Sequence, residues 1–297
     1  MKSSEWSLVI FTIFVQMAVG SFLILGIGYN FFFLKNENGI THQLTSKILF
    51  SISSIIIISL FISFMHLGNP KNAIYALRNI SSSWLSREIL FVGLFAGLVS
   101  FFAFCHDKEI FTSQVRNVLA LIALSAGLVS IFTMSKIYMI PTVPAWNNSP
   151  TPIQFYLTAF ILGIATFLAG LILFSGKLKI DLNEVLQFEK ITKILLIITI
   201  ILLTLQLVVW LLHISSLSGG GLAGRMSYSL VMKEYAPLFY ARIFLAVSSI
   251  ILIVYFILGI RENLFDTKLY LLSFILVIIS EIIGRYLFYL MFARTGV

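Results

Sequence analysis

Long apolar runs separated by short polar connections fill almost the whole chain. Residues 8–33, 48–67, 88–105, 118–140, 153–174, 191–214, 239–260 and 269–291 form eight such runs. An α-helix needs about 20 apolar residues to cross a bilayer core about 30 Å thick, and these runs have that length. They lack the alternation of apolar and polar residues that is typical of strands in a membrane barrel. The pattern therefore predicts an all-α, polytopic integral membrane bundle of eight transmembrane helices.

The composition supports this class. Of the 297 residues, 59% are hydrophobic and only 11% are charged, whereas a soluble domain is about 45–50% apolar and about 25% charged. The net charge of +8 then indicates basic loops at anionic headgroups rather than binding to nucleic acid. The first run exceeds the 7–15 apolar residues of a signal peptide, so we expect it to remain as the first span of a single domain, residues 1–297.

The basic residues of the connections predict the orientation of the bundle. Eight spans place both termini on one side of the membrane. Of the 20 Lys and Arg residues, seven lie on the side of the termini, ten lie on the opposite side and three lie within spans. Because basic connections favour the cytoplasmic side, this distribution predicts that both termini are outside.

The ionisable residues within or beside spans gather toward the predicted outer side. They are His66, Glu88, Lys136, His213, Arg242, Glu281 and Arg285. A charge at the centre of a span costs about 2.5–3.5 kcal/mol, so these groups require partners or a hydrated cavity. Glu281 and Arg285 are four residues apart on one helix face, which predicts a salt bridge. Lys136 can extend its ammonium to the interface.

His66 and Glu88 together suggest proton chemistry. They are predicted near the same outer face, and imidazole changes charge near neutral pH. Such a pair could accept a hydrogen bond and a proton from a quinol hydroxyl. His66 and His213 are the one pair that could hold a haem between spans, since His42 and His106 are predicted in solvated inner loops. Cys105 is the single cysteine, which excludes a cysteine-ligated iron–sulfur cluster in this chain.

The same ionisable residues are compatible with two other functional classes. Intramembrane Glu and Arg are also typical of secondary transporters. Against this class, the sequence shows no inverted repeat and no series of polar residues that reaches the inner face. A passive membrane anchor without a quinol site is the second alternative. The glycine-rich stretch 218–224 does not match a phosphate-binding pattern, and we expect it to be a flexible part of the longest connection, residues 215–238.

Short segments in a fixed order along the sequence carry a resemblance to a known family. They are Glu5-Trp6, HLGNP at 66–70, SWLSREI at 83–89, TVPAW at 142–146, YARI at 240–243, and EIIGR at 281–285 followed by Phe288-Tyr289. Together these segments resemble the membrane anchor subunits of bacterial dimethyl sulfoxide reductase. Position 136 differs from the family pattern, because the sequence has Lys136 where an arginine is expected.

The resemblance implies a multi-pass protein of the bacterial inner membrane that oxidises menaquinol. It implies two partners, a four-cluster iron–sulfur subunit that receives the electrons and a molybdopterin catalytic subunit that determines the terminal acceptor. The protein would thus be a component of an oxidoreductase complex, with no haem and no metal of its own. His66 and Glu88 would accept and relay the protons, in a menaquinol-site region that includes Lys136, Arg242, Glu281 and Arg285.

Overall fold

The computed structural model describes residues 3–28, 39–64, 75, 77–175, 182–259 and 267–295, and all regular structure within these ranges is helical. Within these ranges, eight helices are long and apolar enough to cross a membrane. They are α1 (Ser3–Gly28), α2 (Gly39–Phe64), α4 (Trp84–Asp107), α5 (Ser113–Tyr138), α6 (Pro150–Ser175), α7 (Leu182–Ser218), α9 (Ala236–Gly259) and α10 (Thr267–Leu290). The predicted fold class and the order of the spans are therefore confirmed.

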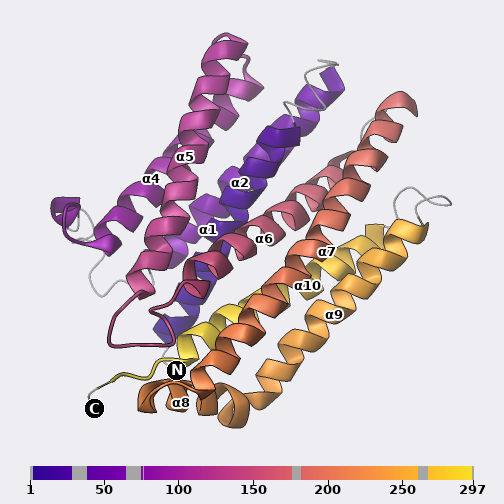
Figure 1. Cartoon of the computed structure of the whole chain (residues 1–297). Helices are drawn as coiled ribbons and strands as arrows, with labels where there is room; N and C mark the ends of the chain where they lie inside the picture. The colour runs from indigo at the N-terminus through magenta and orange to yellow at the C-terminus, as the bar shows by residue number, and fades with distance from the viewer. Residues whose placement is uncertain are drawn as a thin grey trace.

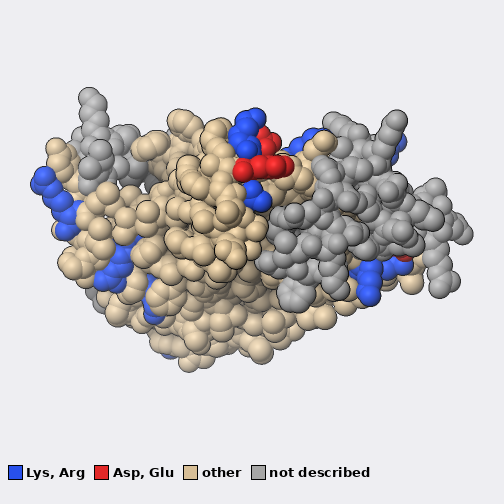
Figure 2. All heavy atoms as spheres, turned by 90° about the horizontal axis from the view of Figure 1, so that it is seen from above, with Lys and Arg blue, Asp and Glu red and all other residues tan. Residues whose placement is uncertain are grey.

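Both termini lie at the same end of the bundle, which we call the terminal end (Figure 1). The opposite end, where α4 is joined to α5, is called the distal end. Figure 2 views the distal end and shows Lys and Arg side chains scattered over it, with Asp and Glu beside them at one place. The side of the membrane that each end faces stays a prediction.

Residues 215–238, which were predicted to be the longest connection between spans, are mostly helical. After α7 ends at Ser218, residues 219–221 lead into α8 (Leu222–Ser229) and the π-helical turn η4 (Leu230–Glu234). α8 lies at the terminal end (Figure 1), where Ser227 Oγ donates a hydrogen bond of 2.7 Å to the Met291 carbonyl oxygen beyond α10. The prediction that this whole segment is a loop is wrong, because α8 is too short to stand out as an apolar run.

The eight spans pack as two sets of four with the same order of neighbours. In the first set, α1, α2, α4 and α5 each contact the next helix, and α5 closes back onto α1. In the second set, α6, α7, α9 and α10 repeat this order, and α10 closes back onto α6. No repeat is visible in the sequence, so the equivalence lies in the packing rather than in the residues.

The two sets meet along α1 and α6, the two central helices. In their most apolar windows 78% and 72% of the residues are buried, against 28–44% in the other six spans. A Cβ atom on Gly20 would lie 1.8 Å from the Ala159 carbonyl oxygen, and one on Gly163 would lie 2.2 Å from the Gly20 carbonyl carbon. Small residues allow helix backbones in membranes to approach closely, so this crossing requires glycine on both helices.

The short 3-10 helix η3 (Leu77–Asn79) precedes α4 at the terminal end. Ser83 then caps α4, because its side chain accepts a hydrogen bond from the Ser86 amide, as N-cap residues commonly do. Arg87, in the first turn, donates to the carbonyl oxygens of Ile80 and Ser81 at 2.8 and 2.7 Å. This anchored turn fixes the start of the helix that carries Glu88.

Candidate functional site

The structure places five of the six predicted site residues in the halves of their helices nearer the terminal end. Glu88 lies on α4, Lys136 on α5, Arg242 on α9, and Glu281 and Arg285 on α10. All except the half-buried Lys136 are at most 6% exposed. The sixth residue, His66, lies outside the described residues.

Glu281 is held by neutral polar side chains rather than by an arginine. Its Oε2 accepts hydrogen bonds from Thr158 Oγ1 at 2.7 Å and from Gln206 Nε2 at 2.8 Å. Gln206 Nε2 also lies 3.0 Å from Thr158 Oγ1. These contacts join α6, α7 and α10 through one carboxylate.

The predicted salt bridge between Glu281 and Arg285 is not formed. Arg285 Nη2 instead donates a hydrogen bond of 2.9 Å to Gln16 Oε1 on α1, and its guanidinium carbon lies 3.6 Å from the centre of the Phe155 ring. The two side chains share a helix face, but the nearest hydrogen-bonding partners of both come from other helices. Arg285 therefore links α10 to the first set of spans.

Arg242 lies between an aromatic ring and a glycine. Its guanidinium carbon is 4.1 Å from the centre of the Trp210 ring, an arrangement that stabilises a cation at an aromatic face. On the α10 side, a Cβ atom on Gly284 would come within 2.5 Å of the same carbon. The absence of a side chain at Gly284 thus creates the space that Arg242 occupies.

A small polar cavity of about 10 Å³ lies among Arg242, Glu281 and Arg285, with Thr158 and Gln206 also in its wall. This volume accommodates about one water molecule. Two atoms of Arg242, Nε and Nη1, are buried without a hydrogen-bond partner among the described residues. A water molecule in the cavity would provide the oxygen acceptor that these donors need.

Two tyrosines connect this region to α1 and α4. The hydroxyl oxygens of Tyr138 and Tyr289 lie 3.2 Å apart, and the Tyr289 hydroxyl lies 3.4 Å from Thr12 Oγ1. The Glu88 carboxyl is close enough to act electrostatically on both phenols. Arg285 acts on the same two phenols. We call this polar region the terminal polar cluster. Its members are Thr12, Gln16, Glu88, Tyr138, Thr158, Gln206, Arg242, Glu281, Arg285 and Tyr289.

Sequence reasoning identified the charged members of this cluster but missed the neutral ones. Gln16, Thr158 and Gln206 each stand in an apolar run, and each makes a hydrogen bond to a buried charge. Their isolated position was a usable signal, because a polar group in an apolar environment is costly unless it is hydrogen-bonded.

Lys136 does not join the terminal polar cluster. Its ammonium lies 5.4 Å from the centre of the Phe132 ring, one turn earlier on α5. No carboxylate of the described residues is within ion-pair distance of it. The structure therefore gives Lys136 an aromatic neighbour and no link to Glu88 or Glu281.

His213 holds the proline-rich connection between α5 and α6. Its buried ring hydrogen-bonds to the backbone of Ala145, and the next residue, Trp146, donates from Nε1 to the Phe288 carbonyl oxygen at 2.7 Å. The connection is thus fixed to α7 and α10. Within the described ranges, no group of three or more His, Cys, Asp or Glu side chains could hold a metal ion.

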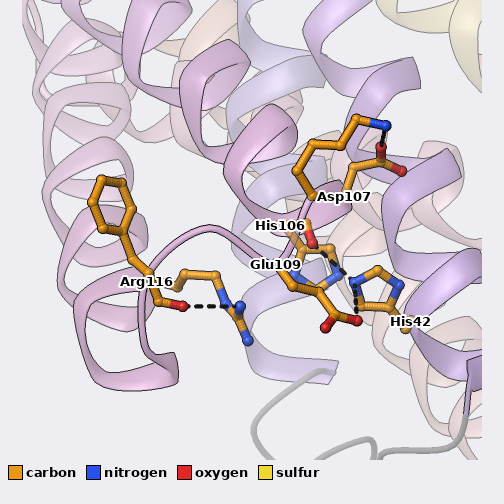
Figure 3. A network of polar contacts seen from close by, with 7 residues as sticks. His42, His106, Asp107, Glu109 and Arg116 are labelled. Atoms are coloured by element: carbon orange, nitrogen blue, oxygen red, sulfur yellow. Dashed lines mark hydrogen bonds and ion pairs between the residues drawn. The ribbon is translucent and has the colours of Figure 1, made fainter.

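The other two histidines meet at the distal end, contrary to the prediction that they lie in solvated loops. His42 lies on α2, and His106 ends α4 and is only 2% exposed. Their rings stack with centres 4.6 Å apart, and His42 Nε2 lies 2.9 Å from the His106 carbonyl oxygen (Figure 3). The prediction failed because both helices extend further than the apolar runs, which brings the two rings together.

These features define a polytopic membrane protein with a buried cluster of ionisable groups near one end of its bundle. The family model described as the DMSO reductase anchor subunit (DmsC) matches residues 1–291, and the chain belongs to this family. With its eight apolar helices, this places the chain in the bacterial inner membrane as a multi-pass protein.

Two curated relatives support the assignment. The protein is 31% identical over 168 residues to the C subunit of the anaerobic dimethyl sulfoxide reductase of Haemophilus influenzae, a match that covers 57% of this sequence and 59% of the relative. It is 30% identical over 159 residues to YnfH, an anaerobic dimethyl sulfoxide reductase subunit of Escherichia coli K12, a match that covers 54% of this sequence and 55% of the relative. The matches thus span between half and two thirds of the length of these relatives.

Proposed function

We propose that this protein is the menaquinol-oxidising membrane anchor of an anaerobic respiratory molybdoenzyme complex resembling dimethyl sulfoxide reductase. Its partners are a four-cluster iron–sulfur subunit, which receives the electrons, and a molybdopterin catalytic subunit. The observation that carries the proposal is the burial of Glu88, Arg242, Glu281 and Arg285 toward one end of the bundle, in a protein of the anchor-subunit family.

Quinol oxidation explains why ionisable groups are buried there. A quinol has an apolar tail and a polar ring, and it loses two protons and two electrons when it becomes a quinone. Its site must therefore combine an apolar approach from the lipid with proton acceptors near the membrane surface. The position of Glu88, buried in the second turn of α4 at the terminal end, supports this role.

The proposed sequence begins when menaquinol enters from the lipid toward the terminal end. His66 accepts a hydrogen bond from one hydroxyl and takes its proton, a role that rests on the resemblance of residues 66–70. Glu88 takes part in accepting the protons, and Glu281 helps to relay them to the terminal side. The two electrons pass to the iron–sulfur subunit, which covers the same end.

The arginines stabilise this chemistry electrostatically. Arg242 and Arg285 line the same small cavity as Glu281, so two positive charges lie near this carboxylate. Arg285 donates to Gln16 and Arg242 lies over the Trp210 ring, so neither guanidinium occupies the carboxylate oxygens. Thr158 and Gln206 hold the Glu281 carboxylate in place by donating hydrogen bonds to its Oε2.

The test measures menaquinol-analogue oxidation by the assembled complex. Substitution of His66→Ala or Glu88→Gln should lower the rate at least about 10²-fold, the usual contribution of a positioned acid or base. The matched controls are His42→Ala and Glu109→Gln, because both residues lie at the distal end. These controls should leave the rate near that of the unchanged complex.

Two outcomes would contradict the proposal. Full activity of an assembled His66→Ala complex would rule out the role assigned to His66, and failure of the unchanged protein to bind a quinone analogue would show that it is a passive anchor. Failure of an iron–sulfur subunit to co-purify, under conditions that keep the protein folded, would favour the transporter alternative. Co-purification combined with binding of one quinone analogue that is lost in His66→Ala would support quinol oxidation.

A further inference from the structure

A second cavity, distinct from the terminal polar cluster, lies at the distal end of the first set of spans. It has a volume of about 400 Å³ and is formed by α1, α2, α4 and α5. This volume is within the range of about 300–1,000 Å³ that is typical of small-molecule sites. Its apolar wall includes Phe22, Leu25, Phe102, Ala120 and Leu124.

The cavity is open space that the described residues do not fill. A Cβ atom on Gly26, in its wall, would meet no atom within 4 Å. Ile27 and Leu121, also in its wall, are 44% and 63% exposed. Because these residues belong to membrane spans, the cavity opens toward lipid.

One end of the cavity is polar and positively charged. Ser113, Arg116 and Asn117 come from the first turns of α5, where amide groups and the helix dipole favour an anion. Arg116 Nη1 donates to the Phe111 carbonyl oxygen at 3.3 Å (Figure 3). Among the described residues, the other guanidinium donors have no hydrogen-bond partner and can serve a ligand.

The neighbouring carboxylates do not neutralise Arg116. Asp107 pairs with Lys108 at 3.1 Å, and Glu109 lies 3.8 Å from His42 Nε2. No carboxylate of the described residues is within ion-pair distance of Arg116. Among the described residues, the cation at the mouth of the cavity is therefore without a compensating carboxylate.

A buried hydroxyl on the facing helix adds a second polar signal. Thr45 on α2 is only 4% exposed, and its Oγ1 has no hydrogen-bond partner among the described residues. Thr45 forms part of the cavity wall. A buried hydroxyl without a hydrogen-bond partner costs free energy. A ligand with an oxygen acceptor would remove this cost by accepting a hydrogen bond from Thr45.

We propose that this cavity binds one anionic phospholipid, with its phosphate at Arg116, Asn117 and the start of α5. An acyl tail lies against the apolar wall. The depth fits this ligand, because Arg116 is near the start of its span and Leu124 lies eight residues, about 12 Å, further along the helix. The charge also favours a phospholipid over menaquinol, whose polar ring is neutral.

Native mass spectrometry of the full-length protein in detergent tests this site. Phosphatidylglycerol and phosphatidylcholine with the same acyl tails are added at a series of concentrations. One phosphatidylglycerol should bind about fivefold more tightly than phosphatidylcholine, the effect of one basic residue near an anionic headgroup. Arg116→Gln should remove this preference, and Gly26→Leu should weaken the binding of both lipids.

Matched variants control for general effects on the protein. Lys108→Gln removes an exposed cation at the same end, and Gly97→Leu adds a side chain where a Cβ also meets nothing within 4 Å, but neither residue forms the cavity. Both variants should bind the lipids as the unchanged protein does. Thermal unfolding identifies any variant that has lost its fold.

Three results would overturn the proposal. The first is equal binding of the two lipids to the unchanged protein. The second is an undiminished preference for phosphatidylglycerol in folded Arg116→Gln. The third is displacement of phosphatidylglycerol by inorganic phosphate alone, or by one equivalent of menaquinone, which would assign the cavity to a free anion or to a quinone.

Discussion

Glu281 shows how one residue can determine the stability of a buried charged region. It is the carboxylate that acts on both Arg242 and Arg285, and all three residues are at most 5% exposed. Buried charges without a partner are strongly destabilising, at about 3–5 kcal/mol when one member of a buried pair is removed. Glu281 is therefore expected to matter for folding as well as for proton transfer.

Glu281→Gln should lower the free energy of unfolding by several kcal/mol. The amide keeps the shape of the side chain but removes the negative charge that offsets two guanidinium groups. The measurement is thermal or denaturant unfolding in detergent. Glu109→Gln, at a carboxylate whose side chain is 73% exposed, is the control and should change stability by less than about 0.5 kcal/mol. Equal stability of the two variants would contradict the assigned role of Glu281.

Gly284→Ala should displace Arg242 from the face of Trp210. The added Cβ would lie 2.5 Å from the guanidinium carbon, and overpacking of this kind costs about 1–3 kcal/mol. A changed tryptophan emission spectrum together with a lower unfolding temperature would show the displacement. Gly259→Ala, whose Cβ meets nothing within 4 Å, should change neither quantity. An unaltered spectrum in Gly284→Ala would argue against the contact.

Local sequence patterns could predict the charges of the terminal polar cluster but not their partners. Spacing along one helix made Arg285 the visible partner of Glu281. The observed partners, Thr158 and Gln206, are 123 and 75 residues away in the sequence. Only the packing of α6 and α7 against α10 brings them together, and that packing has no local signature.

At the scale of elements, the crossing of α1 and α6 depends on two glycines. Gly20→Ala should destabilise the bundle by about 1–3 kcal/mol, because the new Cβ would overlap the Ala159 carbonyl oxygen and force the helices apart. Gly93→Ala is the matched control, since a Cβ there meets nothing within 4 Å. It should be neutral or slightly stabilising, because alanine is the better helix former. The unfolding temperature of the two variants in detergent distinguishes them.

The spans themselves were predictable because bilayer thickness sets a minimum apolar length. Their ends were not, because a helix can continue beyond the apolar core. α7 has 37 residues, and α5 begins at Ser113, five residues before the predicted run. α8 was missed for the opposite reason, since its eight residues need not cross a bilayer at all.

At the scale of the whole molecule, the orientation can be tested with single cysteines. Cys105, the natural cysteine, is fully buried, so Cys105→Ala provides a background for labelling. Ser149→Cys, in the exposed terminal-end connection, should react with an impermeant maleimide added outside intact spheroplasts. Lys108→Cys, at the distal end, should react only after the membrane is opened. The reverse pattern would show that the termini are inside.

The repeated packing of the two sets of spans has a consequence for how such a fold can arise. A unit of four spans begins and ends on the same side of the membrane. Two copies joined end to end therefore keep one orientation, without any change in the charges of their connections. Tandem duplication of such a unit therefore accounts for the repeated packing, and later divergence accounts for the lack of a repeat in the sequence.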